Sequence, residues 1–449
     1  MLVVVAFDRS ADDDLIERAS SIDMMELAAD VGPVPAQVGA ILVFASGGHL
    51  TATAVRDALS DRIRGIPRLR QQLVSTPPGC GRPVWVDDPG CDIARHVHDV
   101  RCPPPGDEEA LLRVAADVVT QRLPPDRPLW SATFVTGLEG GACALIVVFH
   151  HVLADGMGGL AVLANLIDGV DRPPGTDFPR PKPPWRRLAG DAARGRLRAL
   201  TQLAGVPVQL RDALAELRPG STPRAPRCSL NRPVGTRRRF GIVRADLAQV
   251  RSVGHDRGGT VNDVVLAAVS GALSSLLAHR GEHVDHVVVS APVSGRTEAT
   301  AGQLGNQVGV IPVTLPTSGR PLDRLEAIAD ATRAHKTGTR GASAALLAPV
   351  FRALATLGAL RWLIERQHLV TTFVTNLRGP DAPVSFVGST IAEVVPLNMV
   401  TGNVAVGFAV LSYAGTLTVT VTVDADAVPD SRFLVDALRV ELGALTRRR

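Results

Sequence analysis

Apolar and polar positions alternate along the chain with two periods, and these periods predict where strands and helices lie. Continuous or alternating apolar runs predict strands at residues 36–45, 131–137, 144–149, 238–243, 284–293, 307–315 and 370–376, with two or three more between 392 and 423. Apolar residues spaced three and four apart predict helices at residues 21–29, 51–64, 107–121, 157–168, 260–278, 321–339 and 431–445. Because strands and helices are interleaved in both halves, the pattern predicts an α/β fold with mixed sheets flanked by helices.

The segment from residue 144 to residue 168 is where we expect the chemistry to lie. Its pattern predicts a strand covered on both faces, then a glycine-rich turn and a helix. His150 and His151 stand at the end of that strand, and Asp155 and Gly156 follow in the turn. Since successive strand side chains point to opposite faces, only one histidine can enter a given cavity, and the other must pack.

Length and proline content divide the chain into two halves. A single hydrophobic core rarely extends over 449 residues, so two domains are expected. Residues near 171–185 and 219–233 are rich in proline, with a helical pattern between them. We therefore expect an N-terminal domain over residues 1–170, a partly helical crossover over 171–235 and a C-terminal domain over 236–449.

The composition favours a globular protein of the cytoplasm. The net charge of +4 is small for this length and does not indicate a nucleic-acid partner. The five cysteines form no CxxC pair and fit reduced thiols better than disulfides. The apolar start runs into aspartates and lacks the pattern of a signal peptide, and no window has the roughly 18 uncharged apolar residues of a membrane span.

A helical stretch from residue 185 to residue 217 bears on membrane attachment. Arginines cluster near its start, at positions 186, 187, 194, 196 and 198. Such a helix can lie on an anionic membrane or lipid-droplet surface. It can equally be a solvated crossover helix that packs on the second domain, so the sequence leaves peripheral membrane association open.

A histidine at a strand end suits general base catalysis, which contributes roughly 10² to 10⁴ in rate. An alcohol, amine or thiol could then attack an activated acyl group directly. Such a histidine is also often structural, and the residues alone leave both roles open. The sequence has no HExxH, GxSxG, GxGxxG or phosphate-loop motif. Cys91, His96, His98 and Cys102 match no common zinc-finger spacing, so neither a metal nor a cofactor is expected.

The sequence HHVLADG, which begins at His150, resembles the HHxxxDG motif shared by chloramphenicol acetyltransferases, condensation domains and bacterial wax ester synthase/diacylglycerol acyltransferases. Further ordered matches favour the last family: PLW at 128–130, ND at 262–263, PVSGR at 292–296, GNQVGVIPVTLP at 305–316 and TNLRGP at 375–380. The segment near the N-terminus that runs from SSIDMMELAAD to GRPVWVDD also resembles the corresponding part of this family. The resemblance covers almost the whole chain, and the ordered set is more specific than any one motif.

The resemblance implies two chloramphenicol-acetyltransferase-like domains with a tunnel at their interface, open at both ends. Acyl-CoA would enter from one side, and a fatty alcohol or diacylglycerol from the other. His151 would be the general base and His150 its packed neighbour. Asp155, followed by Gly156, would be mainly structural, with Arg296 as its salt-bridge partner.

The resemblance also implies residues for substrate binding or structural support. Asn262 and Asp263 would line or brace the site, although capping of a helix start is an equally good role for them. Asn306 and Asn376 fall in the two later motifs. Pro128 and Trp130 would form a packing element.

One motif departs from the family, and two other functions stay open. The family's last motif usually reads NVPGP, whereas here it reads NLRGP, from Asn376 to Pro380. The charged Arg378, in place of an apolar–proline pair, could narrow the tunnel or recognise a different acceptor. The first alternative function is condensation with a carrier-bound acyl donor. The second is a catalytically silent lipid-binding homologue.

Overall fold

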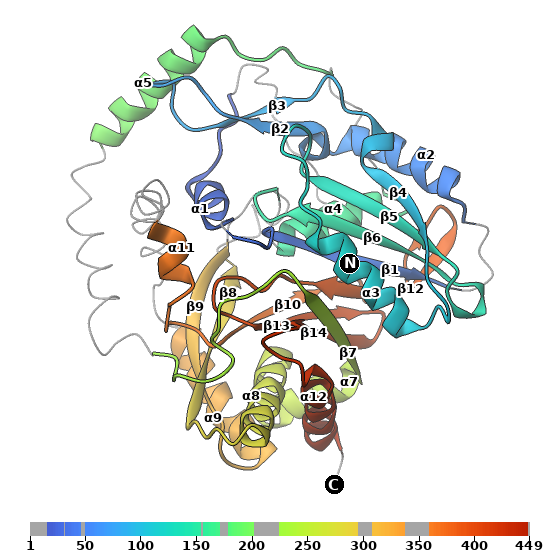
Figure 1. Ribbon diagram of the computed structural model, residues 1–449, viewed down its shortest axis with the longest axis vertical. Coiled ribbons are helices and arrows are strands. Elements are labelled where there is room, and N and C mark those ends of the chain that lie inside the picture. Colours follow the sequence, from blue (N-terminus) through green and yellow to red (C-terminus); the bar gives the residue numbers. More distant parts are fainter. Residues whose placement is uncertain are drawn as a thin grey trace.

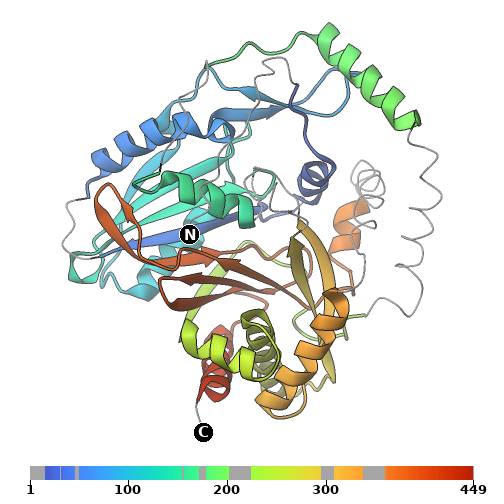
Figure 2. The same cartoon turned by 180° about the vertical axis from the view of Figure 1, so that it is seen from behind.

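The computed structural model folds the chain around two six-stranded sheets and a small two-stranded one (Figure 1; Figure 2). It describes residues 16–30, 32–45, 50–153, 156–170, 178–201, 224–294, 308–336 and 359–447. Strands and helices are interleaved in both halves, so the predicted α/β class with mixed sheets is confirmed.

The first sheet holds the predicted histidine strand at its centre. Its order is β11-β12-β1-β6-β5-β4, with β1 (Gln37–Phe44), β4 (Val97–Arg101), β5 (Trp130–Thr136), β6 (Cys143–His150), β11 (Ser385–Phe386) and β12 (Ser389–Leu397). Every residue of β6 after Cys143 is buried, as expected for an apolar strand covered on both faces. β6 pairs antiparallel with β1 on one side and with β5 on the other.

Four helices accompany this sheet, and their starts follow the expected capping pattern. They are α1 (Ser21–Ala29), α2 (Ala52–Arg62), α3 (Glu108–Thr120) and α4 (Gly156–Leu166). Ser20, Thr51 and Asp107 cap the first three by accepting a hydrogen bond from a backbone N–H of the first turn. α3 contacts β1 and β6 of the first sheet and β7 of the second, so it links the two halves.

The second sheet has the order β7-β14-β13-β10-β8-β9. Its strands are β7 (Arg238–Asp246), β8 (His286–Ser294), β9 (Val308–Pro316), β10 (Thr372–Arg378), β13 (Val406–Tyr413) and β14 (Thr416–Asp424). On the side away from the first sheet lie α7 (Leu247–Asp256), α8 (Val261–His279), α9 (Pro321–Lys336) and α12 (Ser431–Thr446) (Figure 1). α8 is long and apolar enough to cross a membrane, but most of it is buried in this core.

β12 lies in a place that the hydrophobic pattern does not predict. The alternating run from 392 to 423 predicts consecutive antiparallel strands, and β13 and β14 do form such a hairpin around Gly415. β12 instead crosses to the first sheet and pairs antiparallel with β1. The place beside β13 is taken by β10, which runs parallel to it and comes earlier in the chain. A long-range parallel partner leaves no local signal, so the pattern alone cannot assign β12 to its sheet.

α5 (Trp185–Thr201) packs on the N-terminal half. Its Leu188 joins a small core with Cys80, Val84 and Val86 around the hairpin of β2 (Gln71–Val74) and β3 (Val84–Asp87). Arg18 adds an ion pair to Asp191 at 2.7 Å. The expectation that this helix packs on the second domain is therefore wrong for its described part. α11 (Ala359–Ile364) lies on the same side of the molecule as α5 in both views (Figure 1; Figure 2).

Candidate active site

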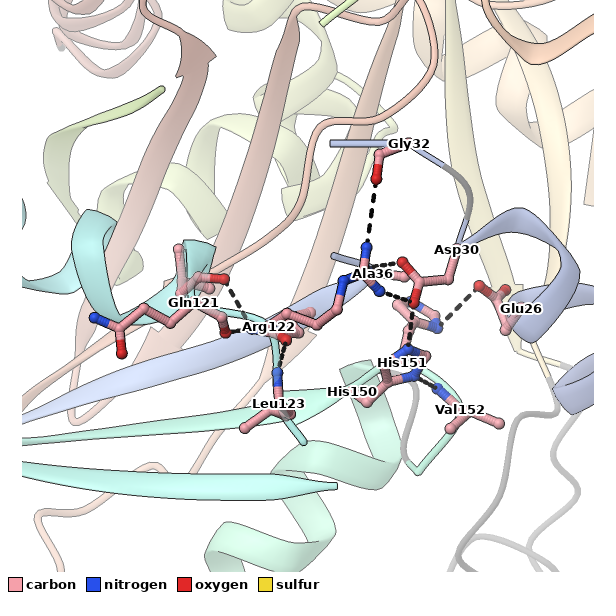
Figure 3. A network of polar contacts seen from close by, with 12 residues as sticks. Glu26, Asp30, Gly32, Ala36, Gln121, Arg122, Leu123, His150, His151 and Val152 are labelled. Carbon is pink, nitrogen blue, oxygen red and sulfur yellow. Dashed lines mark hydrogen bonds and ion pairs between the residues drawn. The ribbon is translucent and has the colours of Figure 1, made fainter. Parts of the chain in front are cut away.

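The two histidines lie where β6 ends, beside the end of α1 (Figure 3). The N–H of His150 donates to the carbonyl of Leu129 and that of His151 to the carbonyl of Ala36, so neighbouring chain segments hold both backbones. A turn over residues 151–153 then directs the chain away from the sheet. The strand therefore stops between the histidines, and the two side chains occupy different environments.

Both nitrogens of the His150 ring contact polar atoms of the protein. The N–H of Val152 donates to Nδ1 at 3.1 Å, and Nε2 lies 3.2 Å from Oδ2 of Asp30. An Nδ1 atom that accepts must carry a lone pair, so the hydrogen-bond network assigns the proton to Nε2, which donates to the carboxylate. The side chain is only 6% exposed. His150 thus has no nitrogen left for a substrate.

Asp30 is the hub of this network. Its Oδ1 accepts from the N–H of Ala36 at 3.0 Å, and its Oδ2 accepts from His150 and from the Arg122 guanidinium. Burial would raise the pKa of this carboxyl, but the hydrogen bonds from His150, Arg122 and Ala36 outweigh burial and lower the pKa to about 2. Asp30 is therefore a stable anion that fixes the orientation of the His150 ring.

His151 is the more accessible histidine, with 23% of its side chain exposed. Its Nδ1 lies 3.5 Å from Oε2 of Glu26, on the last turn of α1 (Figure 3). A carboxylate beside Nδ1 favours the tautomer with a proton there, which leaves a lone pair on Nε2. The two histidines therefore differ in their surroundings: both nitrogens of His150 contact the protein, whereas the His151 side chain is partly exposed beside Glu26.

The ND motif begins α8, and its two residues have different surroundings. Asp263 is 3% exposed and accepts from the N–H and Oγ1 of Thr260 and from Oγ1 of Thr332. It therefore takes the helix-capping role. Asn262 accepts a hydrogen bond from Nδ2 of Asn376 at 3.3 Å.

The direction of Asn376 follows from the alternation of side chains along β10. Val374, two residues earlier, belongs to the core around α8, whereas Leu377 packs against the core of the first half. Asn376 shares its face with Val374. The contact between Asn262 and Asn376 thus braces α8 against β10 on the side of the second sheet that is turned away from the first.

The PLW element is a packing element in the structure. Pro128 and Trp130 are buried, and Trp130 Nε1 donates to the carbonyl of Leu69 at 2.8 Å. The His96 ring stacks on the indole at 4.6 Å, and its Nδ1 contacts the carbonyl of Trp130 at 2.9 Å. His96 therefore serves this packing, and no cluster of metal-binding side chains occurs among the described residues.

Arg378 lies on the surface of the described structure. Its side chain is 74% exposed at the end of β10 and pairs with Asp381 at 2.9 Å. Its guanidinium therefore extends into solvent beside Asp381. Gly156 is the first residue of α4, whereas Asp155, Arg296 and Asn306 lie outside the described residues.

Sequence reasoning missed the two acidic partners of the histidines. Glu26 and Asp30 lie four residues apart at the end of a correctly predicted helix, a spacing that places both on one helix face. That spacing is a usable signal for paired roles. The separation of about 120 residues between α1 and β6 hides which side chains these acids meet.

Comparison with known proteins shows the family to which the chain belongs. Residues 19–265 match the wax ester synthase/diacylglycerol acyltransferase catalytic domain, and residues 304–446 match the C-terminal domain of the same family. A probable diacylglycerol O-acyltransferase of Mycobacterium tuberculosis, tgs1, is 30% identical, with 97% of this chain and 94% of that protein covered. A putative diacylglycerol O-acyltransferase of the same organism, Rv3371, is also 30% identical, over 90% of this chain and 84% of that one.

Solved structures agree on the fold. The wax ester synthase/diacylglycerol acyltransferase of Marinobacter aquaeolei VT8 has a TM-score of 0.68 at 22% identity, with 95% of this chain and 98% of that chain covered. The condensation domain of the Monacolin K polyketide synthase MokA has a TM-score of 0.62 at 15% identity, with coverage of 96% and 97%. The chain therefore belongs to the wax ester synthase/diacylglycerol acyltransferase family. The predictions of this family, of its fold class and of an acyltransferase are confirmed.

Proposed function

We propose that this protein forms an ester by direct transfer of a long-chain acyl group from acyl-CoA to a lipophilic alcohol, with His151 as the general base. The observation that carries the proposal is the contrast between the two histidines. Both nitrogens of His150 are engaged by the protein, whereas His151 is partly exposed and has a carboxylate near Nδ1. Membership in the family supports the same reaction.

The reaction needs one proton to move twice. Nε2 of His151 accepts the hydroxyl proton of the alcohol as the alcohol oxygen attacks the thioester carbonyl. The tetrahedral intermediate then expels the CoA thiolate, and the imidazolium returns the proton to that sulfur. The products are an ester and CoA, and no cofactor or metal takes part. Donor and acceptor must meet at one imidazole, so we propose a tunnel between the two halves that admits each from a different side.

The acceptor class follows from the relatives. The Mycobacterium proteins carry the name diacylglycerol O-acyltransferase, and the Marinobacter protein carries both activities of the family in its name. We propose diacylglycerol, giving triacylglycerol, and fatty alcohol, giving wax ester, as the two acceptors to test first.

The test is thiol release from palmitoyl-CoA with hexadecanol or diolein, comparing the wild type with His151→Ala. We expect kcat to fall roughly 10²- to 10⁴-fold, the contribution of a general base. His98→Ala is the matched control, because His98 lies exposed on β4 and should leave the rate unchanged. Equal rates for the wild type and His151→Ala would defeat the proposal.

Two alternatives are decided by the same assay. A condensation-type enzyme would use an acyl group on a carrier protein and would be inactive with free palmitoyl-CoA. A catalytically silent lipid-binding homologue would bind acyl-CoA but would release no thiol from it, whichever acceptor alcohol is added.

We further propose that the protein works in the cytoplasm at the surface of a membrane or lipid droplet, with α5 as a contact. All five cysteines are unpaired thiols, as suits a reducing compartment. α5 buries Leu188 and leaves Trp185 and Leu197 exposed, at 60% and 64%. Exposed Arg186, Arg194 and Arg196 flank these apolar residues. An indole among arginines suits an anionic lipid interface.

Liposome flotation tests this attachment. Replacing arginines 186, 187, 194, 196 and 198 with glutamine should reduce flotation with anionic vesicles and leave binding to zwitterionic vesicles unchanged. The control replaces the same number of exposed arginines elsewhere, at positions 237, 239, 432, 439 and 447. Unchanged flotation of the α5 variant would dispose of the membrane role.

A further inference from the structure

α1 presents two carboxylates to the two histidines, one to each. Asp30 lies against His150, and Glu26, one helical turn earlier, lies against His151 (Figure 3). The first contact immobilises a packed ring. The second contact involves His151, the ring that the proposed function uses. Glu26 lies in the N-terminal stretch SSIDMMELAAD, to which the sequence assigned no role.

The position of Glu26 is fixed from both ends of α1. At the start, Ser20 and Asp23 form a capping box with reciprocal hydrogen bonds at 2.8 and 3.0 Å, and Asp23 is 5% exposed. At the end, Asp30 is held by Ala36, Arg122 and His150. Because α1 is anchored at both ends, holding the Glu26 carboxylate in place costs little entropy.

The site around this pair is only partly exposed to water. The Glu26 and His151 side chains are 16% and 23% exposed, so their interaction is screened less than that of a surface pair. The separation of 3.5 Å between Oε2 and Nδ1 is longer than a normal N–H···O hydrogen bond. A catalytic contact that is long in the free enzyme can shorten when substrate binds.

We propose that Glu26 is the positioning residue for His151. It accepts the Nδ1 proton, selects the tautomer that keeps the Nε2 lone pair for the substrate hydroxyl, and stabilises the imidazolium that forms as that proton is taken. The inference rests on the proposed function, since it gives Glu26 a role only if His151 is the base. Glu26 itself touches no reacting atom.

The kinetic test compares Glu26→Gln with the wild type in the palmitoyl-CoA assay. We expect kcat to fall roughly 10- to 100-fold with KM within about twofold, because the variant loses transition-state support and no substrate contact. Glu26→Asp, which keeps a carboxylate, should recover part of the rate. Glu109→Gln is the matched control, since Glu109 is 61% exposed on α3.

The second readout is the tautomer of His151, measured by long-range ¹H–¹⁵N spectra of protein labelled at histidine and assigned by difference with His151→Ala. The wild type should carry the proton on Nδ1, and Glu26→Gln should shift it toward Nε2. A wild-type ring protonated on Nε2, or an unchanged kcat in Glu26→Gln, would overturn the inference, and the wild-type spectrum decides even if the variant does not fold. An active His151→Ala would instead overturn the proposed function, so the two failures are distinguishable.

Discussion

Replacing Asp30 with asparagine should test whether the buried carboxylate network holds the site together. The substitution keeps the size of the side chain and removes its charge. The new NH2 group would take the place of Oδ1, which accepts from the N–H of Ala36, or of Oδ2, which accepts from Arg122 and from Nε2–H of His150. In either position it faces donors, so at least one hydrogen bond is lost.

The magnitude follows from the pKa of Asp30. The folded protein lowers this pKa from 3.8 to about 2. Each tenfold change in acidity is worth about 1.4 kcal/mol, so the charged carboxylate contributes about 2.5 kcal/mol to the free energy of unfolding at pH 7. The side chain is 11% exposed, so little of this is lost to solvent screening.

The sign of the pH dependence is fixed by the lowered pKa. The contribution is complete above the unfolded pKa of about 4 and is lost as the pH falls through the folded pKa of about 2. The difference in unfolding free energy between the wild type and Asp30→Asn should therefore shrink from about 2.5 kcal/mol at pH 7 to about 1.3 kcal/mol at pH 3.

The assay is urea denaturation followed by far-UV circular dichroism at both pH values, with equal denaturant slopes as the condition for comparison. Asp126→Asn is the control, because Asp126 is a surface acid whose side chain is 61% exposed. The reasoning would be refuted if Asp30→Asn had the wild-type midpoint at pH 7, or if the difference between the two proteins did not decrease at pH 3.

Two further predictions concern motif residues with opposite exposure, the buried Trp130 and the exposed Arg378. Trp130→Phe keeps one aromatic ring but removes the Nε1–H that donates to the carbonyl of Leu69, so we expect a loss of about 1–3 kcal/mol in unfolding free energy, measured by the same denaturation, with an unchanged KM. Arg378→Ala removes an exposed pair with Asp381, so we expect an unfolding free energy within about 0.5 kcal/mol of the wild type and unchanged rates across a series of alcohols; altered acceptor preference would contradict the solvent-exposed placement.

Local patterns predict most single elements of this fold. The strand at β6, the helix at α1 and the Thr260–Asp263 cap of α8 all lie where periodicity and capping residues place them. Each depends on residues close in sequence. The partner of β12 does not, because its pairing with β1 joins segments about 350 residues apart.

The candidate site was likewise predictable from the sequence only in part. The motif located His150 and His151, and strand alternation indicated that only one of them could act. It could not say which acidic residues accompany them, because Glu26 and Asp30 reach the histidines through the packing of α1 against the end of β6. The exposure of Arg378 was likewise hidden, since a motif gives the order of residues and not the direction of a side chain.

The route of β12 has a consequence for how the protein is made. β1 leaves the ribosome long before β12, so one of its two edges finds its neighbour only after residue 397 has been synthesised. Until then the early sheet presents an open edge of backbone donors and acceptors that other chains can join. A nascent or truncated N-terminal half should therefore depend on chaperones to avoid aggregation, and separating the halves at the proline-rich crossover should remove a strand from the very sheet that bears the histidines.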